Sequence, residues 1–111
     1  MKRLGSLSMK TAAEIGIQVC RLIQFMNTAD NPILYLDLQP KNLLVCNGAV
    51  RLIDFDHAQY AEDVTAFGER YGTIGFAAPE QYRGEPLDCR TDVYAIGALL
   101  YYMCRGEPPG N

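Results

Sequence analysis

The stretch of sequence that decides the fold is ILYLDLQPKNLLVCNGAVRLIDFD, residues 33–56. Within it, two runs of β-prone apolar residues, 43–46 and 49–53, lie on either side of Asn47-Gly48. An Asn-Gly pair between two such runs is a strong signal for a two-residue hairpin turn, because both turn positions need a positive φ angle. We therefore predict a small antiparallel β-hairpin here.

The register of this hairpin brings polar residues together. Pairing Leu43 with Leu52 places Asn42 beside Asp54 at the open end of the ribbon, and Asp37 lies on the loop that leads into the first strand. Oxygen ligands of this kind, too few to enclose an ion, suit Mg²⁺, which keeps waters and shares itself with substrate phosphates. Each residue alone is typical of a turn at a strand end, so the hypothesis rests on their convergence.

A helix is predicted before this stretch. Thr11 and Glu14 form a T-x-x-E capping box, and the apolar residues that follow recur at the spacing of one helix face. Asn31-Pro32 should close the helix, because a residue before proline is disfavoured in the α region.

A second helix is predicted near the end of the sequence. Thr91-Asp92 should cap it, residues 93–105 should form it, and Gly106 should end it. Its residues are apolar on nearly every side, so we expect a buried helix. The segment between, residues 54–85, is predicted to be mostly irregular, with at most one helical turn.

Composition indicates one globular domain. The chain has 111 residues, 49% of them hydrophobic, and a formal net charge of −3 without a basic stripe, so we expect no nucleic-acid partner. Residues 93–104 are the most apolar segment and are shorter than the roughly 20 residues that cross a bilayer. The four cysteines show no metal-binding spacing and three lie in apolar runs, so we expect reduced, core-like thiols and a cytoplasmic location.

Four motifs in order resemble those of protein kinases. YLDLQPKNLLV, residues 35–45, resembles the catalytic loop HRDLKPEN, and Asp-Phe-Asp at 54–56 is similar to the DFG metal-binding motif. Ala-Pro-Glu at 78–80 matches the APE motif, and TDVYAIGALLYYM at 91–103 resembles the buried helix that follows it. Each motif alone is weak, but four in this order and spacing are specific.

The resemblance implies roles for five residues. Asp37 resembles the catalytic base that orients the substrate hydroxyl, and Asn42 and Asp54 resemble the two Mg²⁺ ligands. Leu44 resembles the residue beneath the adenine ring. Thr73 resembles the activation-segment threonine whose hydroxyl contacts the catalytic aspartate. ATP and Mg²⁺ are the cofactors that this resemblance implies.

Further positions resemble structural residues of the family. Asp92 resembles the aspartate that holds the catalytic-loop backbone, and Glu80 the glutamate that pairs with an arginine later in the domain. Tyr35 and Phe55 resemble members of the spine that joins the two lobes. His57, the only histidine, is predicted to be an ordinary loop residue.

Three positions depart from the family pattern. Gln39 stands where the family has the lysine that neutralises the transferred phosphate, so it is a candidate catalytic residue without the charge. Leu36 replaces the arginine of HRD, and Asp56 replaces the glycine of DFG. These departures favour the alternative that the protein is a pseudokinase or an interaction module.

The fold class expected from the resemblance is mainly α with a small β-hairpin, the α+β C-terminal lobe of a protein-kinase-like domain truncated at both ends. Residues 1–10 stay unassigned and residues 11–111 form the partial kinase domain. No Gly-rich loop or V-A-I-K lysine precedes Thr11. We therefore expect the missing N-lobe or a neighbouring domain as a partner, an isolated chain that is inactive, and self-association through exposed apolar surface.

The implied function is that of a protein serine/threonine kinase, which transfers the γ-phosphoryl group of ATP to a hydroxyl of a protein substrate in the complete parent. Pro40 and Gly72-Thr73 favour serine and threonine over tyrosine as acceptors. A small-molecule phosphotransferase of the aminoglycoside or choline kinase type is a weaker alternative, because the APE motif and the helix after it build a platform for protein substrates.

Overall fold

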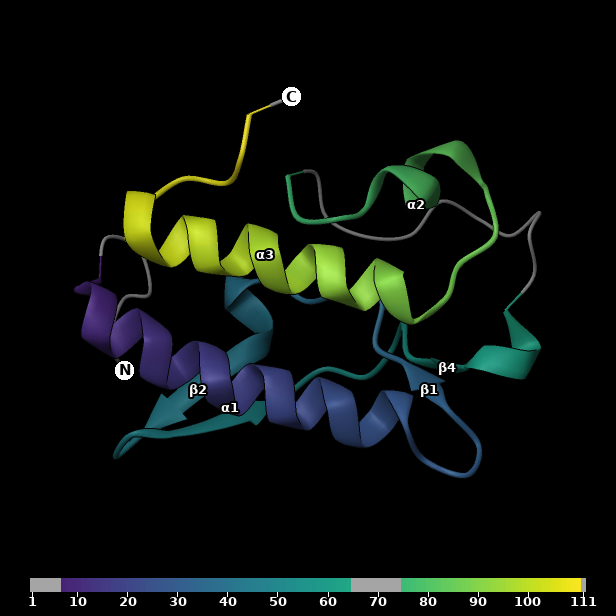
Figure 1. Cartoon of the computed structure of the whole chain (residues 1–111), viewed down its shortest axis with the longest axis horizontal. Helices are drawn as coiled ribbons and strands as arrows, with labels where there is room; N and C mark the ends of the chain where they lie inside the picture. The colour runs from purple at the N-terminus through teal and green to yellow at the C-terminus, as the bar shows by residue number, and fades with distance from the viewer. Residues whose placement is uncertain (1–6, 65–74, 111) are drawn as a thin grey trace.

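The computed structural model describes residues 7–64 and 75–110, which form a mixed structure of helices and small antiparallel strand pairs (Figure 1). The helices are α1 (Met9–Asn27), α2 (Pro79–Arg83) and α3 (Cys89–Arg105), with 3-10 turns η1 (Pro40–Asn42) and η2 (Ala61–Asp63). The strands are β1 (Ile33–Leu34), β2 (Leu43–Cys46), β3 (Ala49–Leu52) and β4 (Gln59–Tyr60). The expectation of a mainly helical fold with a small hairpin is therefore met in the described ranges.

Strands β2 and β3 form the predicted hairpin. Leu43 pairs with Leu52 in an antiparallel register, as the two-residue turn requires. The turn residues Asn47 and Gly48 both have positive φ angles, 50° and 78°. Gln18 of α1 fixes the turn, because its Nε2 donates to the Gly48 carbonyl at 2.7 Å. The predicted register is confirmed.

Strands β1 and β4 form a second pair that the sequence did not indicate. Ile33 pairs with Tyr60 and Leu34 with Gln59. Strands of two residues are too short to show an alternating pattern, and β4 lies within the segment that was predicted to be irregular. This pairing folds the chain after Asp54 back towards the segment that leads into Asp37.

Helix α1 begins earlier and ends earlier than predicted. Ser8 is its N-cap, because the Ser8 hydroxyl accepts a hydrogen bond from the Thr11 amide at 3.2 Å. The helix ends at Asn27, whose Nδ2 donates to the Ile33 carbonyl at 2.8 Å and so ties the helix end to β1. The proline at position 32 therefore follows a four-residue loop rather than the helix itself.

Helix α3 also begins one turn earlier than predicted. Asp88 is the N-cap, and its Oδ1 accepts from the Arg90 amide at 2.9 Å. Thr91 is the third residue of the helix, and its hydroxyl accepts from the Asp88 amide at 3.3 Å, which completes a capping box. The predicted end is confirmed, since Gly106 is the C-cap with φ of 80°.

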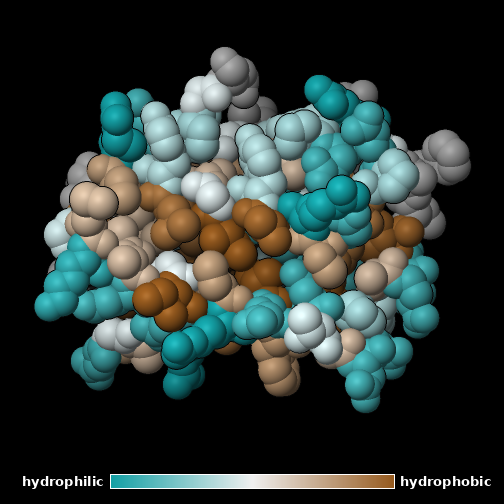
Figure 2. Space-filling view, viewed as in Figure 1, coloured by the Kyte–Doolittle hydropathy of each residue, from teal (hydrophilic) through white to brown (hydrophobic). Residues whose placement is uncertain are grey.

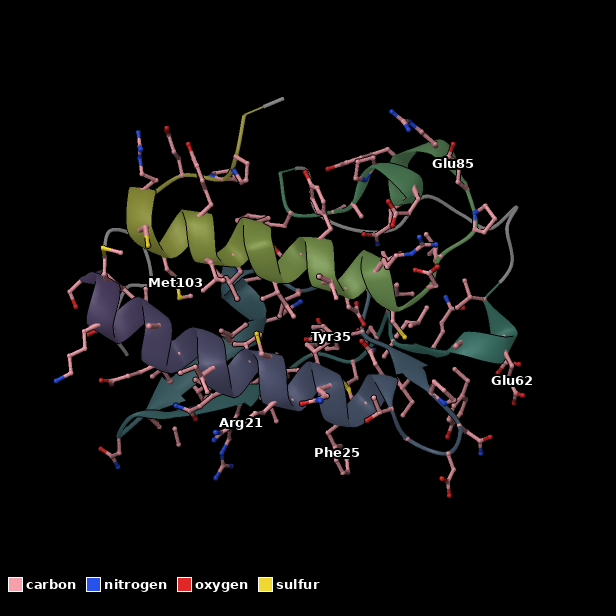
Figure 3. All side chains as sticks on the ribbon, viewed as in Figure 1. Arg21, Phe25, Tyr35, Glu62, Glu85 and Met103 are labelled. Carbon is pink, nitrogen blue, oxygen red and sulfur yellow. The ribbon has the colours of Figure 1, made fainter. Side chains whose placement is uncertain are left out.

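The core lies between α1 and α3, which run side by side in opposite directions (Figure 1). Figure 3 shows Tyr35 between these two helices, and it is fully buried, as is Met103. Apolar side chains gather along the middle of the face shown in Figure 2. Helix α3 is not buried on every side as expected, because Val93 is 59% and Tyr94 44% exposed.

All four cysteines are free and exposed, so the expectation of core-like thiols was wrong for their burial. Val19 and Met103, which precede Cys20 and Cys104, are fully buried, so the thiols of these two cysteines lie on the outer sides of α1 and α3. Within the described ranges, no helix combines the length and the apolar character that crossing a membrane requires.

Candidate functional site

Asp37 is the centre of a polar cluster on the loop between β1 and β2. Its side chain is mostly buried, with 8% of the residue exposed. The Gln39 Nε2 donates to Asp37 Oδ1 at 2.9 Å. The Asn42 Nδ2 donates to Asp37 Oδ2 at 3.1 Å and to the Asp37 backbone carbonyl at 2.6 Å. Two neutral amides therefore hold the carboxylate in one orientation.

The hairpin brings Asp54 to this cluster. The Ile53 amide donates to the Asn42 carbonyl at 3.0 Å, which extends the β2–β3 pairing by one residue pair. Asp54 is the next residue, so it lies at the open end of the hairpin. Asp54 Oδ1 accepts from the Asp56 amide at 2.9 Å. Asp56 does not take the positive φ angle that glycine would allow, since Leu36 and Asn47 are the only non-glycine residues of the described ranges that do.

The donor set suits a hard cation that brings its own further ligands. Asn42 uses its amide nitrogen towards Asp37, so its amide oxygen is the atom available to a cation. Asp54 has a second carboxylate oxygen beyond the one bound to Asp56. In the part of the chain that the structure describes, no three His, Cys, Asp or Glu side chains group closely enough to hold a metal alone. Mg²⁺ fits, because it completes its shell with waters and phosphate oxygens.

His57 is a residue of this site that the sequence reasoning missed. Its Nδ1 lies 3.3 Å from Asp37 Oδ2, and its side chain is 41% exposed. It was predicted to be an ordinary loop residue because no cysteine or second histidine accompanies it. The β1–β4 pairing folds the segment that carries His57 back towards Asp37, and this pairing has no sequence signal of its own.

Asp92 holds the backbone that leads into Asp37. Its Oδ2 accepts from the Tyr35 amide at 2.8 Å, and its Oδ1 accepts from the Leu36 amide at 2.9 Å. The Asn27 Nδ2 also donates to Oδ2, at 3.1 Å. Asp92 is fully buried, and this burial raises the pKa of its carboxyl group against the three hydrogen bonds, which lower it.

Leu36 carries an unusual backbone conformation in this loop. Its φ angle is 68°, in the left-handed region, and its side chain is 2% exposed. A buried leucine offers no donor, so this position cannot hold a phosphate as an arginine would. A non-glycine residue in this region costs about 1 kcal/mol or more, so the surrounding bonds must hold it.

Tyr35 and Phe55 pack against each other beneath the site. Their ring centroids are 5.3 Å apart with an interplanar angle of 77°, an edge-to-face contact. Tyr35 is fully buried whereas Phe55 is 52% exposed. Burial is the main reason why the pKa of Tyr35 rises to about 12.

Leu44, Thr73 and Glu80 are the remaining candidate residues. Leu44 is half-buried on β2. Thr73 lies outside the described residues. Glu80 on α2 accepts a hydrogen bond at 2.9 Å from the hydroxyl of Thr91, so this glutamate is tied to the start of α3.

A buried aspartate, a carboxamide and a second aspartate at the open end of a hairpin form an oxygen-rich site of the kind that phosphotransferases use. A family model described as the protein kinase domain matches residues 1–111, so the chain belongs to the protein kinase family.

Similar proteins agree with this family. A "Probable serine/threonine-protein kinase" of Corynebacterium efficiens is 38% identical over 110 residues, which is 95% of this chain and 16% of that protein. The serine/threonine-protein kinase PknB of Mycolicibacterium smegmatis is 36% identical over 110 residues, and PknB of Mycobacterium tuberculosis 34%, each over 95% of this chain and 17% of its own length. The chain thus spans about a sixth of the length of these relatives.

Proposed function

We propose that this chain is the C-terminal-lobe part of a protein serine/threonine kinase and supplies its catalytic aspartate and its Mg²⁺ ligands. The observation that supports this most is the cluster of Asp37, Asn42 and Asp54 at the open end of the β2–β3 hairpin. The serine/threonine specificity of the relatives supports the choice of substrate hydroxyl. The reaction is transfer of the γ-phosphoryl group of ATP to a protein.

In this proposal, Asp37 accepts a hydrogen bond from the substrate hydroxyl and aligns it for attack. Gln39 and Asn42 hold the carboxylate in place, so little reorganisation is needed when substrate arrives. When bound, Mg²⁺–ATP supplies the phosphoryl group, and Asn42 and Asp54 are the residues that would hold the cation. Leu44, half-buried on β2, would lie beneath the adenine ring.

Gln39 is a neutral donor where a lysine would add positive charge. Its Nε2 is already bonded to Asp37 Oδ1, so its role is to orient the base. A neutral amide stabilises developing negative charge less than an ammonium group does. We therefore propose a slower phosphoryl transfer step than in a kinase that has the lysine.

A further lobe or domain would complete the site over Phe55. This side chain is 52% exposed and lines an open, mainly apolar pocket of about 420 Å³ with Met26, Ile33 and Tyr60. Such a surface favours contact with another apolar segment. Residues 11–111 would then be one part of the kinase domain, with Thr73 contacting Asp37 and the protein substrate lying beside residues 75–78. A cytoplasmic location remains a prediction.

Transfer is best tested with the whole protein, a generic protein substrate and radiolabelled ATP. Asp37→Asn keeps the size of the side chain and removes its charge, so transfer should fall at least about a hundredfold. Asp30→Asn, an exposed carboxylate on the loop after α1, is the matched control and should change nothing. Equal activity in wild type and Asp37→Asn would refute the proposal.

Cation binding is tested on the isotopically labelled 111-residue chain. Mn²⁺ should broaden the NMR signals of the Asn42 side-chain amide and of the Asp54 amide before others. Asp54→Asn should weaken this effect, whereas Asp30→Asn should not. Broadening that is spread over all exposed carboxylates would count against a site.

A non-catalytic role as an interaction module is the second candidate. It is favoured by the crowding of Asp37, whose carboxylate already accepts from Gln39 and Asn42 and lies against His57. This candidate predicts no transfer by the whole protein and no effect of Asp37→Asn on any activity. The same assay therefore separates the two functions.

A further inference from the structure

Gln81 is a buried polar residue that the proposed function does not yet use. It lies on the five-residue helix α2, where Tyr82 next to it is 38% exposed but Gln81 only 3%. A glutamine buried to this extent must have its polar atoms paired, because an unpaired buried amide costs about 1–3 kcal/mol. Its two partners come from two different segments of the chain.

The side-chain oxygen of Gln81 bonds within its own segment. The Ala78 amide donates to Gln81 Oε1 at 2.9 Å, and the Gln81 amide donates to the Ala78 carbonyl, also at 2.9 Å. These two bonds fix the entrance to α2. A glutamate would serve this capping role equally well, since only an acceptor is needed.

The side-chain nitrogen of Gln81 reaches the catalytic-loop segment. Its Nε2 donates at 2.9 Å to the carbonyl of Leu36, a residue 45 positions earlier in the sequence. That carbonyl belongs to the peptide unit that joins Leu36 to Asp37. The Leu36 amide is held from the other end by Asp92 at 2.9 Å. The two bonds together hold Leu36 in the left-handed conformation, which a leucine would not otherwise keep.

We propose that Gln81 is a positioning residue of the phosphotransfer site. Gln81 bonds both the Leu36 carbonyl and the Ala78 amide, so it fixes the orientation of the Asp37 backbone relative to residues 75–78. The substrate would lie beside those residues. Rotation of the Leu36–Asp37 peptide would move the aspartate, and a displacement near 1 Å in an active site can cost about a hundredfold in rate. This inference rests on the proposed function.

The discriminating variant is Gln81→Glu. It keeps the acceptor for the Ala78 amide but replaces the donor to Leu36 by a carboxylate oxygen, which the carbonyl repels. Gln81→Leu removes both bonds. Arg83→Ala, an exposed residue of the same helix, is the control. The first readout is amide hydrogen exchange of the 111-residue chain, measured residue by residue.

In Gln81→Glu, we expect exchange at Leu36 to accelerate about tenfold while Ala78 and the α3 residue Leu99 keep the wild-type rate. In Gln81→Leu, Leu36 and Ala78 should both accelerate. A general stabilising role would instead speed all amides together, and that result would overturn the proposal. Unchanged exchange at Leu36 in both variants would also overturn it.

The second readout is the kinetics of the whole protein. Gln81→Glu should lower kcat for a protein substrate about tenfold or more and leave the KM for ATP within about twofold, because the bond acts on the base and not on nucleotide binding. A kcat within twofold of wild type, with transfer still abolished by Asp37→Asn, would overturn the Gln81 proposal alone. Absence of transfer in wild type would overturn the proposed function and the catalytic role of Gln81 together.

Discussion

Replacing Asp92 by alanine removes the acceptor that holds the backbone of residues 35 and 36, just before Asp37. The Tyr35 and Leu36 amides, at 2.8 and 2.9 Å from the Asp92 carboxylate, would lose their partner inside the protein. Asn27 would lose less, since its Nδ2 also donates to the Ile33 carbonyl at 2.8 Å. The change therefore leaves two buried backbone donors unpaired.

The expected loss of stability follows from these two donors. Each unpaired buried amide costs about 1–3 kcal/mol, so the gross loss is about 2–6 kcal/mol. The net loss of stability should be smaller than this gross value, because burying the charge of the carboxylate was itself unfavourable. We expect a net loss of about 3 kcal/mol, a large share of the roughly 5–15 kcal/mol that stabilises a domain of this kind.

The assay is urea unfolding of the 111-residue chain at pH 7, followed by circular dichroism. A loss of this size should lower the unfolding midpoint by about 1–2 M. Val93→Ala, at a 59% exposed position next to Asp92 in α3, is the control and should change the free energy of unfolding by no more than about 0.5 kcal/mol. A loss below about 0.5 kcal/mol for Asp92→Ala would show that the two amides find water or another partner, and the reasoning would fail.

Three further predictions concern single positions. Burial raises the pKa of Asp92, so the folded state holds the proton of this carboxyl group more tightly than the unfolded state does. The free energy of unfolding of the wild type should therefore fall relative to that of Asp92→Asn as the pH rises from about 4 through the raised pKa. A difference between the two proteins that does not change with pH would contradict this prediction. Gly48→Ala should lower the free energy of unfolding by about 1 kcal/mol in thermal unfolding, because φ is 78° there. Gly97→Ala, in an open position of α3, should raise it by about 0.5–1 kcal/mol. Equal effects of the two substitutions would refute the conformational argument. Gln18→Ala should cost about 1 kcal/mol because its side chain bonds the Gly48 carbonyl at 2.7 Å and the Val50 amide at 3.0 Å, and a loss no larger than that of the exposed neighbour Ile17→Ala would refute it.

The hairpin could be predicted because its signal is local. Asn47 and Gly48 specify a turn in which both φ angles are positive, and a two-residue turn fixes the register of every pair that follows. The register in turn placed Asn42 next to Asp54, which is why part of the candidate site followed from the sequence. Helix boundaries were less accurate, because Ser8 and Asp88 cap more effectively than the residues chosen.

The rest of the site depends on contacts between segments far apart in sequence. His57 lies beside Asp37, between the hairpin and the β1–β4 pairing, and two-residue strands have no periodicity to detect. Gln81 bonds Leu36 across 45 positions, and no sequence pattern links these two residues. Exposed faces of α3 were missed for a similar reason, because an apolar composition does not show which side packs against α1.

The two bonds to Leu36 explain why this loop can hold a conformation that its own sequence disfavours. A leucine at φ of 68° would relax to the right-handed side if either its amide or its carbonyl were free to move. Asp92 holds the amide from α3 and Gln81 holds the carbonyl from α2, so the conformation requires both helices to be in place. The orientation of Asp37 is therefore a property of the assembled fold, because it depends on bonds from two helices that lie far from it in the sequence.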